Sequence, residues 1–97
     1  MFELAKIDLS VTTFKALHDA GKLCIANFLK SDARERIVKE VTTMDKLCTF
    51  ALTEPETGSN ASGITTVAKK VDGGYLLNGR KMWSGSAHWV DYIVVFT

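Results

Sequence analysis

The apolar residues change their spacing near residue 47, and this change limits the fold more than any other feature of the sequence. Before it, they recur every three or four residues, as on one face of an amphipathic helix. After it, they alternate with polar residues in short runs that end at turn formers, as in β-strands. We therefore expect an α+β chain, with helices in residues 1–46 and antiparallel strands in residues 47–97.

Three helices are expected in the first half of the chain. The first carries an apolar face and is interrupted at Gly21. A short second helix follows over residues 22–29. Asp32 and Glu35 have the spacing of a capping box, which predicts the start of a third helix that ends near Thr43. The predicted apolar positions of the first and third helices are Leu4, Ile7, Val11, Phe14, Leu17, Ala33, Ile37 and Val41.

Five strands are expected in the second half. Pro55 ends the first, because proline cannot donate to a sheet ladder. Asp72-Gly73-Gly74 predicts a tight turn, and Asn78-Gly79 predicts a two-residue hairpin. The sheet is unfinished at its last residue, so we expect a truncated part of a larger architecture. The expected strands are residues 47–53, 64–71, 75–77, 80–83 and 91–96.

Composition argues against several classes of function. Twelve Lys and Arg against eleven Asp and Glu leave a net charge of +1, which offers no basic surface for nucleic acid. The apolar runs are far shorter than the roughly 20 residues of a membrane helix. The first residues do not have the pattern of a secretory signal. We therefore expect a soluble protein that neither binds nucleic acid nor spans a membrane.

Cysteine and histidine are too sparse for a metal site. Cys24 and Cys48 have no second pair, which argues against a disulfide framework or a zinc site. Both lie in apolar stretches, so we expect them in the core and the protein in a reducing compartment. His18 and His88 are isolated from other ligand types, and we expect each at the surface or at a helix end.

Residues 53–63 form the segment richest in groups that could contact a ligand. They combine hydroxyls, two carboxylates and the Gly58-Ser59 step between two expected strands. Such a loop can present backbone N–H groups and the Ser59 hydroxyl to an anion such as a pyrophosphate. Taken alone, the composition favours a solvated loop of turn formers over a ligand-binding loop.

A second cluster covers residues 78–86. Trp83 lies beside small residues at the end of an expected strand, where an indole can stack on a flat ligand ring. The alternative is a tryptophan that packs across the sheet.

Together, the run from Phe50 to Asn60 and the run from Asn78 to Trp83 resemble the acyl-CoA dehydrogenase and acyl-CoA oxidase family. The resemblance covers the whole chain, and it is nearest to peroxisomal short-chain acyl-CoA oxidases and glutaryl-CoA dehydrogenases. It implies that residues 1–46 are the C-terminal part of an N-terminal helical domain. Residues 47–97 would be the first part of a middle domain that resembles a β-barrel.

The resemblance implies an FAD site without a catalytic residue. The family's glutamate base belongs to a region that would follow residue 97, and Glu54 matches a loop position that structures the loop or is exposed. Ser59 matches a residue near both the FAD pyrophosphate and the acyl-CoA. The positions that match flavin contacts are Phe50, Ala51, Leu52, Thr53, Gly58, Ser59, Trp83, Ser84 and Gly85.

Three positions depart from the family pattern. Asn60 stands where an aspartate is usual, Thr57 stands where a very small residue is usual and could crowd the turn, and Gly85 stands where most dehydrogenases have threonine. The resemblance to short-chain oxidases, which share this glycine, favours an oxidase over a dehydrogenase.

The resemblance also implies an activity. The whole protein would introduce a 2,3-double bond into an acyl-CoA, pass electrons to oxygen or to an electron-transfer flavoprotein, and form homo-oligomers in the peroxisome or the mitochondrial matrix. We expect these 97 residues alone to be inactive. The alternative is a truncated, non-catalytic binding or interaction module that associates through an open sheet edge.

Overall fold

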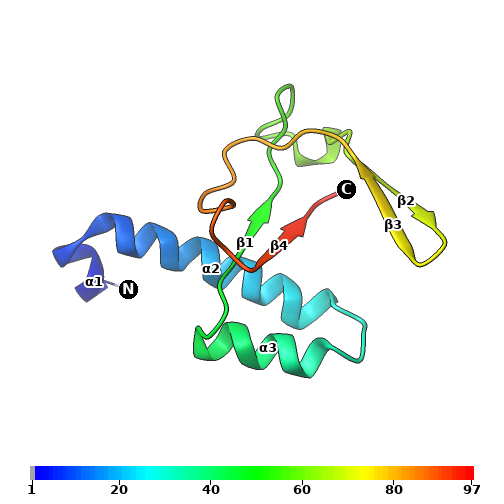
Figure 1. Ribbon diagram of the computed structural model, residues 1–97. Helices are drawn as coiled ribbons and strands as arrows, with labels where there is room; N and C mark the ends of the chain where they lie inside the picture. Colours follow the sequence, from blue (N-terminus) through cyan, green and yellow to red (C-terminus); the bar gives the residue numbers. More distant parts are fainter. Residues whose placement is uncertain (1) are drawn as a thin grey trace. The chain divides into compact units, whose positions relative to one another are not determined.

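The computed structural model describes residues 2–97 and has helices followed by strands, which confirms the α+β prediction (Figure 1). The chain divides into two compact units, which are described separately. One contains Met1–Phe50 and Gly85–Val94, and the other contains Ala51–Ser84 and Val95–Thr97. The elements are α1 (Phe2–Ile7), α2 (Leu9–Phe28), α3 (Arg34–Thr43), β1 (Cys48–Ala51), a 3-10 helix (Ala61–Gly63), β2 (Val67–Val71), β3 (Gly74–Asn78) and β4 (Tyr92–Val95).

The strands form two sheets of two strands each, β1 with β4 and β2 with β3, and residues 2–97 contain no closed barrel. The β2–β3 pair is antiparallel, as predicted. In the other pair, the N–H groups of Tyr92 and Phe96 donate to the carbonyls of Leu47 and Ala51. These bonds advance in the same direction along both strands, so β1 and β4 are parallel and the antiparallel prediction is wrong for them.

Asp8 separates the first two helices. Its carboxylate accepts a hydrogen bond of 2.8 Å from the Ser10 N–H, so it caps α2 and ends the helical run that begins at Phe2. The single apolar face predicted from residue 4 to residue 17 is therefore divided, and Ile7 is 84% exposed. The predicted interruption at Gly21 is wrong, because α2 continues through it to Phe28.

The predicted start of α3 is also partly wrong. Ala33 precedes the helix without a side-chain cap, so Asp32 does not form the expected capping box. Arg34 instead donates from Nη2 to the carbonyl of Ala26, at 2.5 Å. The helix ends at Thr43, as predicted, and Met44 follows in the left-handed conformation with φ 61°.

The core of the first unit lies on one face of α2. His18, Gly21 and Ile25 are the buried residues of this helix, and their spacing places them on the same side. Val41 and Cys48 are also buried. The prediction that His18 lies at the surface or at a helix end is wrong, because it is buried in the middle of α2, whereas the core position of Cys48 is confirmed.

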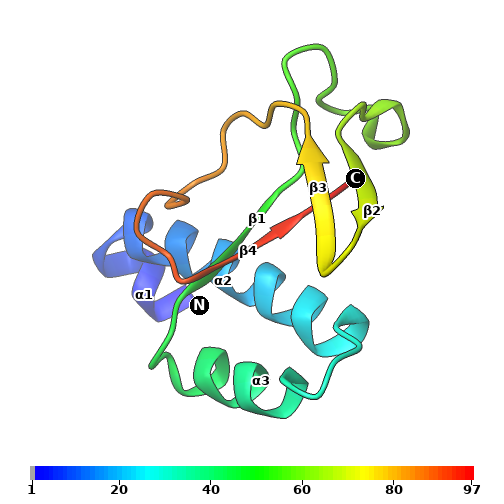
Figure 2. The same cartoon turned by 45° about the vertical axis from the view of Figure 1, so that its right-hand side comes forward.

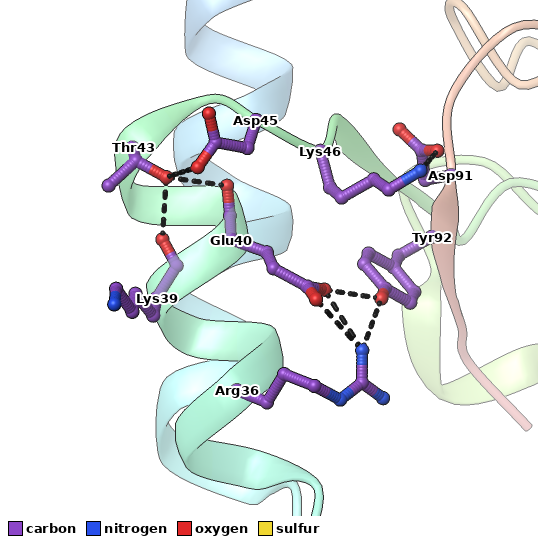
Figure 3. A network of polar contacts seen from close by, with 8 residues as sticks. All are labelled: Arg36, Lys39, Glu40, Thr43, Asp45, Lys46, Asp91 and Tyr92. Carbon is purple, nitrogen blue, oxygen red and sulfur yellow. Dashed lines mark hydrogen bonds and ion pairs between the residues drawn. The ribbon is translucent and has the colours of Figure 1, made fainter.

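A polar network on α3 supplements this core (Figure 3). The Tyr92 hydroxyl donates to Glu40 Oε2 at 2.7 Å, and Arg36 Nη1 lies 2.9 Å from Glu40 Oε1. Beside it, Lys46 Nζ donates to Asp91 Oδ1 at 2.8 Å. The network therefore ties the start of β4 to α3 by side-chain bonds as well as by apolar contact.

Residues 67–78 form a single β-hairpin in the second unit, visible in Figure 2. Val67 pairs with Asn78 and Val71 pairs with Gly74, so the turn falls at Asp72-Gly73, where Gly73 has φ 81°. The predicted hairpin at Asn78-Gly79 is wrong, and residues 80–83 do not form a strand.

Gly79 serves another purpose. A Cβ atom there would lie 2.3 Å from Thr66 Oγ1 and 2.7 Å from Thr66 Cα, so only glycine permits this close approach.

In the described part of the chain, none of the helices has the length and apolar character needed to cross a bilayer.

Candidate functional site

The two motifs that carry the sequence resemblance lie side by side in the second unit. The Met82 N–H donates to the Thr53 carbonyl at 2.8 Å, and Lys81 Nζ donates to the Leu52 carbonyl at 3.0 Å. The segment that leads into Trp83 therefore runs along residues 52–53. Residues separated by about thirty positions in sequence become neighbours at the same end of β1.

Glu54 is the centre of this arrangement. It is only 4% exposed, although glutamate is rarely buried unless it is paired. Its Oε2 accepts from the N–H and the hydroxyl of Thr65, both at 2.7 Å. Its Oε1 accepts from the N–H and the hydroxyl of Thr66, at 2.9 Å and 2.5 Å, and from Lys81 Nζ at 2.7 Å. Glu54 therefore organises its loop, which agrees with the loop-structuring alternative.

These bonds keep the Glu54 carboxylate ionised. The Lys81 ammonium has the largest effect, the Thr66 and Thr65 hydroxyls add to it, and together they hold the pKa of Glu54 well below its ordinary value of 4.5. A carboxylate with five donors and a lowered pKa is a poor general base, because each lone pair is engaged and the proton affinity is low.

The loop after Glu54 accommodates the unusual Thr57. Backbone bonds of 2.9 Å and 3.1 Å join Glu54 and Thr57, and the Thr57 hydroxyl donates to the Gly63 carbonyl at 3.3 Å. Thr57 is 8% exposed, so its side chain fits inside the turn instead of distorting it. Asn60 accepts a bond of 2.7 Å from the Ser62 hydroxyl, which occupies its amide oxygen.

Gly58 and Ser59 follow this turn directly and are exposed. A Cβ atom on Gly58 would meet no atom within 4 Å, so nothing in the described chain requires glycine there. An exposed segment with open space beside its backbone can receive a ligand, as the resemblance predicts for the FAD pyrophosphate.

Trp83 is 84% exposed and has a φ of 58°. A bulky residue in the left-handed region is strained, and such strain is concentrated at functional sites. The alternative in which this indole packs across a sheet is wrong, because Trp83 belongs to no strand. Its ring is therefore available to a flat ligand.

The remaining predicted contacts have different environments. The Ser84 hydroxyl oxygen is buried and has no hydrogen-bond partner among residues 2–97. Ala51 is 5% exposed, and its carbonyl accepts from the Phe96 N–H at 3.0 Å. In the first unit, a Cβ atom at Gly85 would lie 2.6 Å from Leu17 Cδ1, the flexible end of a side chain.

A cavity of about 350 Å³ in the second unit is lined by Glu54, Pro55, Glu56, Thr65, Gly79 and Arg80. Thr53, Ser59 and Trp83 do not line it, so their convergence on one flavin cavity stays a prediction. Sequence reasoning missed Lys81, Thr65 and Thr66 as partners of Glu54. Their residue types and spacing carry no motif that could have identified them.

Comparison with known proteins shows the family. The model of the acyl-CoA dehydrogenase middle domain matches residues 49–97. Benzylmalonyl-CoA dehydrogenase of Aromatoleum aromaticum is 41% identical over 66 residues, which are 68% of this chain and 18% of that protein. Mitochondrial isovaleryl-CoA dehydrogenase of Arabidopsis thaliana is 30% identical over 99% of this chain and 24% of its own length.

Acyl-CoA dehydrogenase of Bacillus subtilis is 32% identical over 97% of this chain and 25% of its own length. The chain thus spans about a quarter or less of these curated relatives. The nearer likeness to peroxisomal oxidases and glutaryl-CoA dehydrogenases stays a prediction. The adjacent motifs of the second unit and the match over residues 49–97 agree, and the chain belongs to the acyl-CoA dehydrogenase family.

Proposed function

We propose that this chain is the flavin-binding segment of an FAD-dependent acyl-CoA oxidoreductase that introduces a 2,3-double bond into acyl-CoA thioesters. The bond between Met82 and Thr53 carries the proposal, because it brings the two motifs of the resemblance together. All nine predicted flavin contacts lie within residues 49–97, which match the family's middle domain. In this proposal the segment contributes flavin-binding elements and lacks the catalytic base.

The residues fit a flavin. The exposed indole of Trp83 offers a stacking face, and the buried, unpaired hydroxyl of Ser84 offers a donor to a polar atom of a ligand. An orphaned buried hydroxyl costs free energy unless a ligand or water satisfies it. Both features are easier to explain if a polar aromatic group binds beside them.

In this proposal each segment has a separate task. The backbone from Phe50 to Leu52 and the Thr53 hydroxyl bind the polar edge of the ring, and Trp83 fixes its plane. Gly58 and Ser59 hold the pyrophosphate, and Ser59 also contacts the acyl-CoA. FAD, when bound, accepts the hydride, so the protein supplies orientation and electrostatics.

The finer assignments are proposals as well. Several relatives, the isovaleryl-CoA dehydrogenase of Arabidopsis thaliana among them, have names that include "mitochondrial", which supports the matrix. Gly85 supports the peroxisomal oxidases. The homo-oligomeric state and the transfer of electrons to oxygen or to an electron-transfer flavoprotein follow from the family alone. The match to the middle domain supports each of them only at the level of the family.

Gel filtration after incubation with FAD tests the proposal. We expect the chain to retain flavin with a shifted absorption spectrum, and to produce no enoyl-CoA from acyl-CoA. Elution of free, unperturbed flavin would contradict the flavin site. Clear product formation would contradict the absence of a base.

A second candidate is the non-catalytic interaction module. The β2–β3 hairpin exposes Tyr75, Leu76 and Leu77 to 67%, 59% and 53%, and an exposed apolar hairpin favours association. The same gel filtration separates the two candidates. An interaction module would elute without flavin, and the fraction of oligomer would increase with protein concentration.

A further inference from the structure

His18 joins three elements of the first unit from inside its core. Its side chain projects from α2 and is 1% exposed. Nε2 lies 2.8 Å from the carbonyl oxygen of Val41 on α3, and Nδ1 lies 3.1 Å from the backbone nitrogen of Cys48 on β1. A single imidazole therefore bridges two helices and the first residue of a strand.

The neighbours determine which nitrogen carries the proton. The Cys48 N–H can only donate, so Nδ1 must present its lone pair. The Val41 carbonyl can only accept, so Nε2 must carry hydrogen. The neutral Nε2–H tautomer satisfies both contacts, whereas the Nδ1–H tautomer and the doubly protonated ring would each direct a hydrogen at the Cys48 N–H.

Other contacts bring β1 close to this ring. The Cys48 thiol lies 3.4 Å from the His18 carbonyl oxygen and 3.6 Å from Nδ1, and it can donate to either acceptor, which adds to the link between the same two residues. Gly21, one turn later on α2, leaves room for the strand, because a Cβ atom there would lie 3.0 Å from the Thr49 carbonyl oxygen. Phe14 stacks on the imidazole at a centroid distance of 6.3 Å.

We propose that His18 is a positioning residue that fixes the start of β1 through its neutral Nε2–H tautomer. The strand continues from Cys48 to Phe50, the first of the predicted flavin contacts. The functional consequence rests on the proposed flavin site. The backbone from Phe50 onward contacts the flavin ring in the correct position only while the His18 imidazole holds Cys48. The imidazole does not contact the flavin and acts only through the strand.

Two amide variants separate the two nitrogens of the ring. In His18→Asn, the amide oxygen can occupy the place of Nδ1 and accept from Cys48. In His18→Gln, the longer amide can reach the place of Nε2 and donate to Val41. The first measurement is the chemical shift of each imidazole nitrogen in the wild-type chain. The second is the rate of hydrogen exchange of the Cys48 amide in each variant, relative to the rates of core amides of α2 in the same variant.

We expect shifts of an unprotonated Nδ1 and a protonated Nε2. Relative to the α2 amides, Cys48 should stay protected in His18→Asn and exchange at least about tenfold faster in His18→Gln, a loss comparable with one hydrogen bond. A protonated Nδ1, or equal Cys48 protection in the two variants, would overturn the proposal. If neither variant folds, the wild-type shifts decide.

FAD titration separates this proposal from the flavin site. If wild type and His18→Asn bind FAD more tightly than His18→Gln, the positioning role is supported. Equal binding by wild type and both variants would overturn that role and leave the flavin site standing. If wild type binds no FAD, the proposed function fails, while the exchange pattern still decides whether His18 holds β1.

Discussion

Lys81 and Glu54, 27 positions apart in the sequence, form an ion pair of 2.7 Å with side chains that are only 12% and 3% exposed. Lys81 belongs to the segment that leads to Trp83, and Glu54 follows Thr53 directly. The pair therefore links the two motifs on which the family resemblance depends. Its burial makes it sensitive to loss of either partner, because the remaining charge would be left without a counter-ion.

Replacement of Glu54 by glutamine should destabilise the second unit. The amide cannot accept from all five donors, and Lys81 loses its counter-ion while the Leu52 carbonyl remains its acceptor. We expect the melting temperature to fall by several degrees in Glu54→Gln. Glu56→Gln is the matched control, because Glu56 is exposed in the same loop, and it should melt as the wild type does.

Stability should decline in acid, and Glu54 should contribute to this decline. Its folded-state pKa is lower than its unfolded value of about 4.5, so its contribution is complete above pH 4.5 and is lost as the pH falls further. Asp19 contributes in the same direction, because bonds from Lys15 and Lys22 lower its pKa to about 2.

Urea unfolding at pH 7, 4.5 and 3 measures this effect. The difference in unfolding free energy between wild type and Glu54→Gln should be constant from pH 7 to pH 4.5 and should shrink at pH 3. A difference that grows as the pH falls would show that the sign of the linkage is wrong.

Gly21→Ala should destabilise the first unit. Alanine is the better helix former by about 1 kcal/mol, but its methyl group would press on the backbone of Thr49, which yields less easily than a side chain. We expect a net loss of roughly 1–3 kcal/mol in chemical unfolding. Gly58→Ala, at an exposed position where a Cβ atom meets no other atom, should change stability by less than about 0.5 kcal/mol. Equal stability of wild type and Gly21→Ala would show that β1 can move away.

Tyr92→Phe should weaken the attachment of β4 to α3. The variant removes the hydroxyl that donates to Glu40 and accepts from Arg36, while the ring remains. We expect faster hydrogen exchange of β4 amides and a lower melting temperature. Tyr75→Phe removes a hydroxyl from an exposed tyrosine and should leave both measurements unchanged. Identical behaviour of the two variants would mean that the Tyr92 hydroxyl in Figure 3 contributes no stability.

The sequence predicted the features that depend on local pattern. The change of period near residue 47 identified the α+β class, and the end of α3 at Thr43 was correct. It failed where a tertiary contact overrides local preference. The turn at Asp72-Gly73 was predicted correctly, but Asn78-Gly79, which also has the composition of a hairpin turn, does not form one. Gly79 is instead required where the backbone passes Thr66.

For the candidate site, too, the sequence predicted the local motifs and missed the tertiary contacts. The runs around Thr53 and Trp83 were recognisable because their residues and order are specific. The partners of Glu54 were not, since threonine and lysine are common in strands and loops. His18 was expected at the surface or at a helix end because no second metal ligand accompanied it. Its actual partners, Val41 and Cys48, contribute backbone groups, which every residue has and no sequence pattern reveals.

The most direct test of the flavin site uses the two tryptophans as separate probes. Trp89→Phe leaves Trp83 as the single tryptophan, and Trp83→Phe leaves Trp89. We predict that FAD quenches the emission of Trp89→Phe strongly and saturably, because the remaining indole stacks on the ring, and quenches Trp83→Phe only weakly. Equal quenching of the two variants, or none in either, would contradict a flavin bound against Trp83.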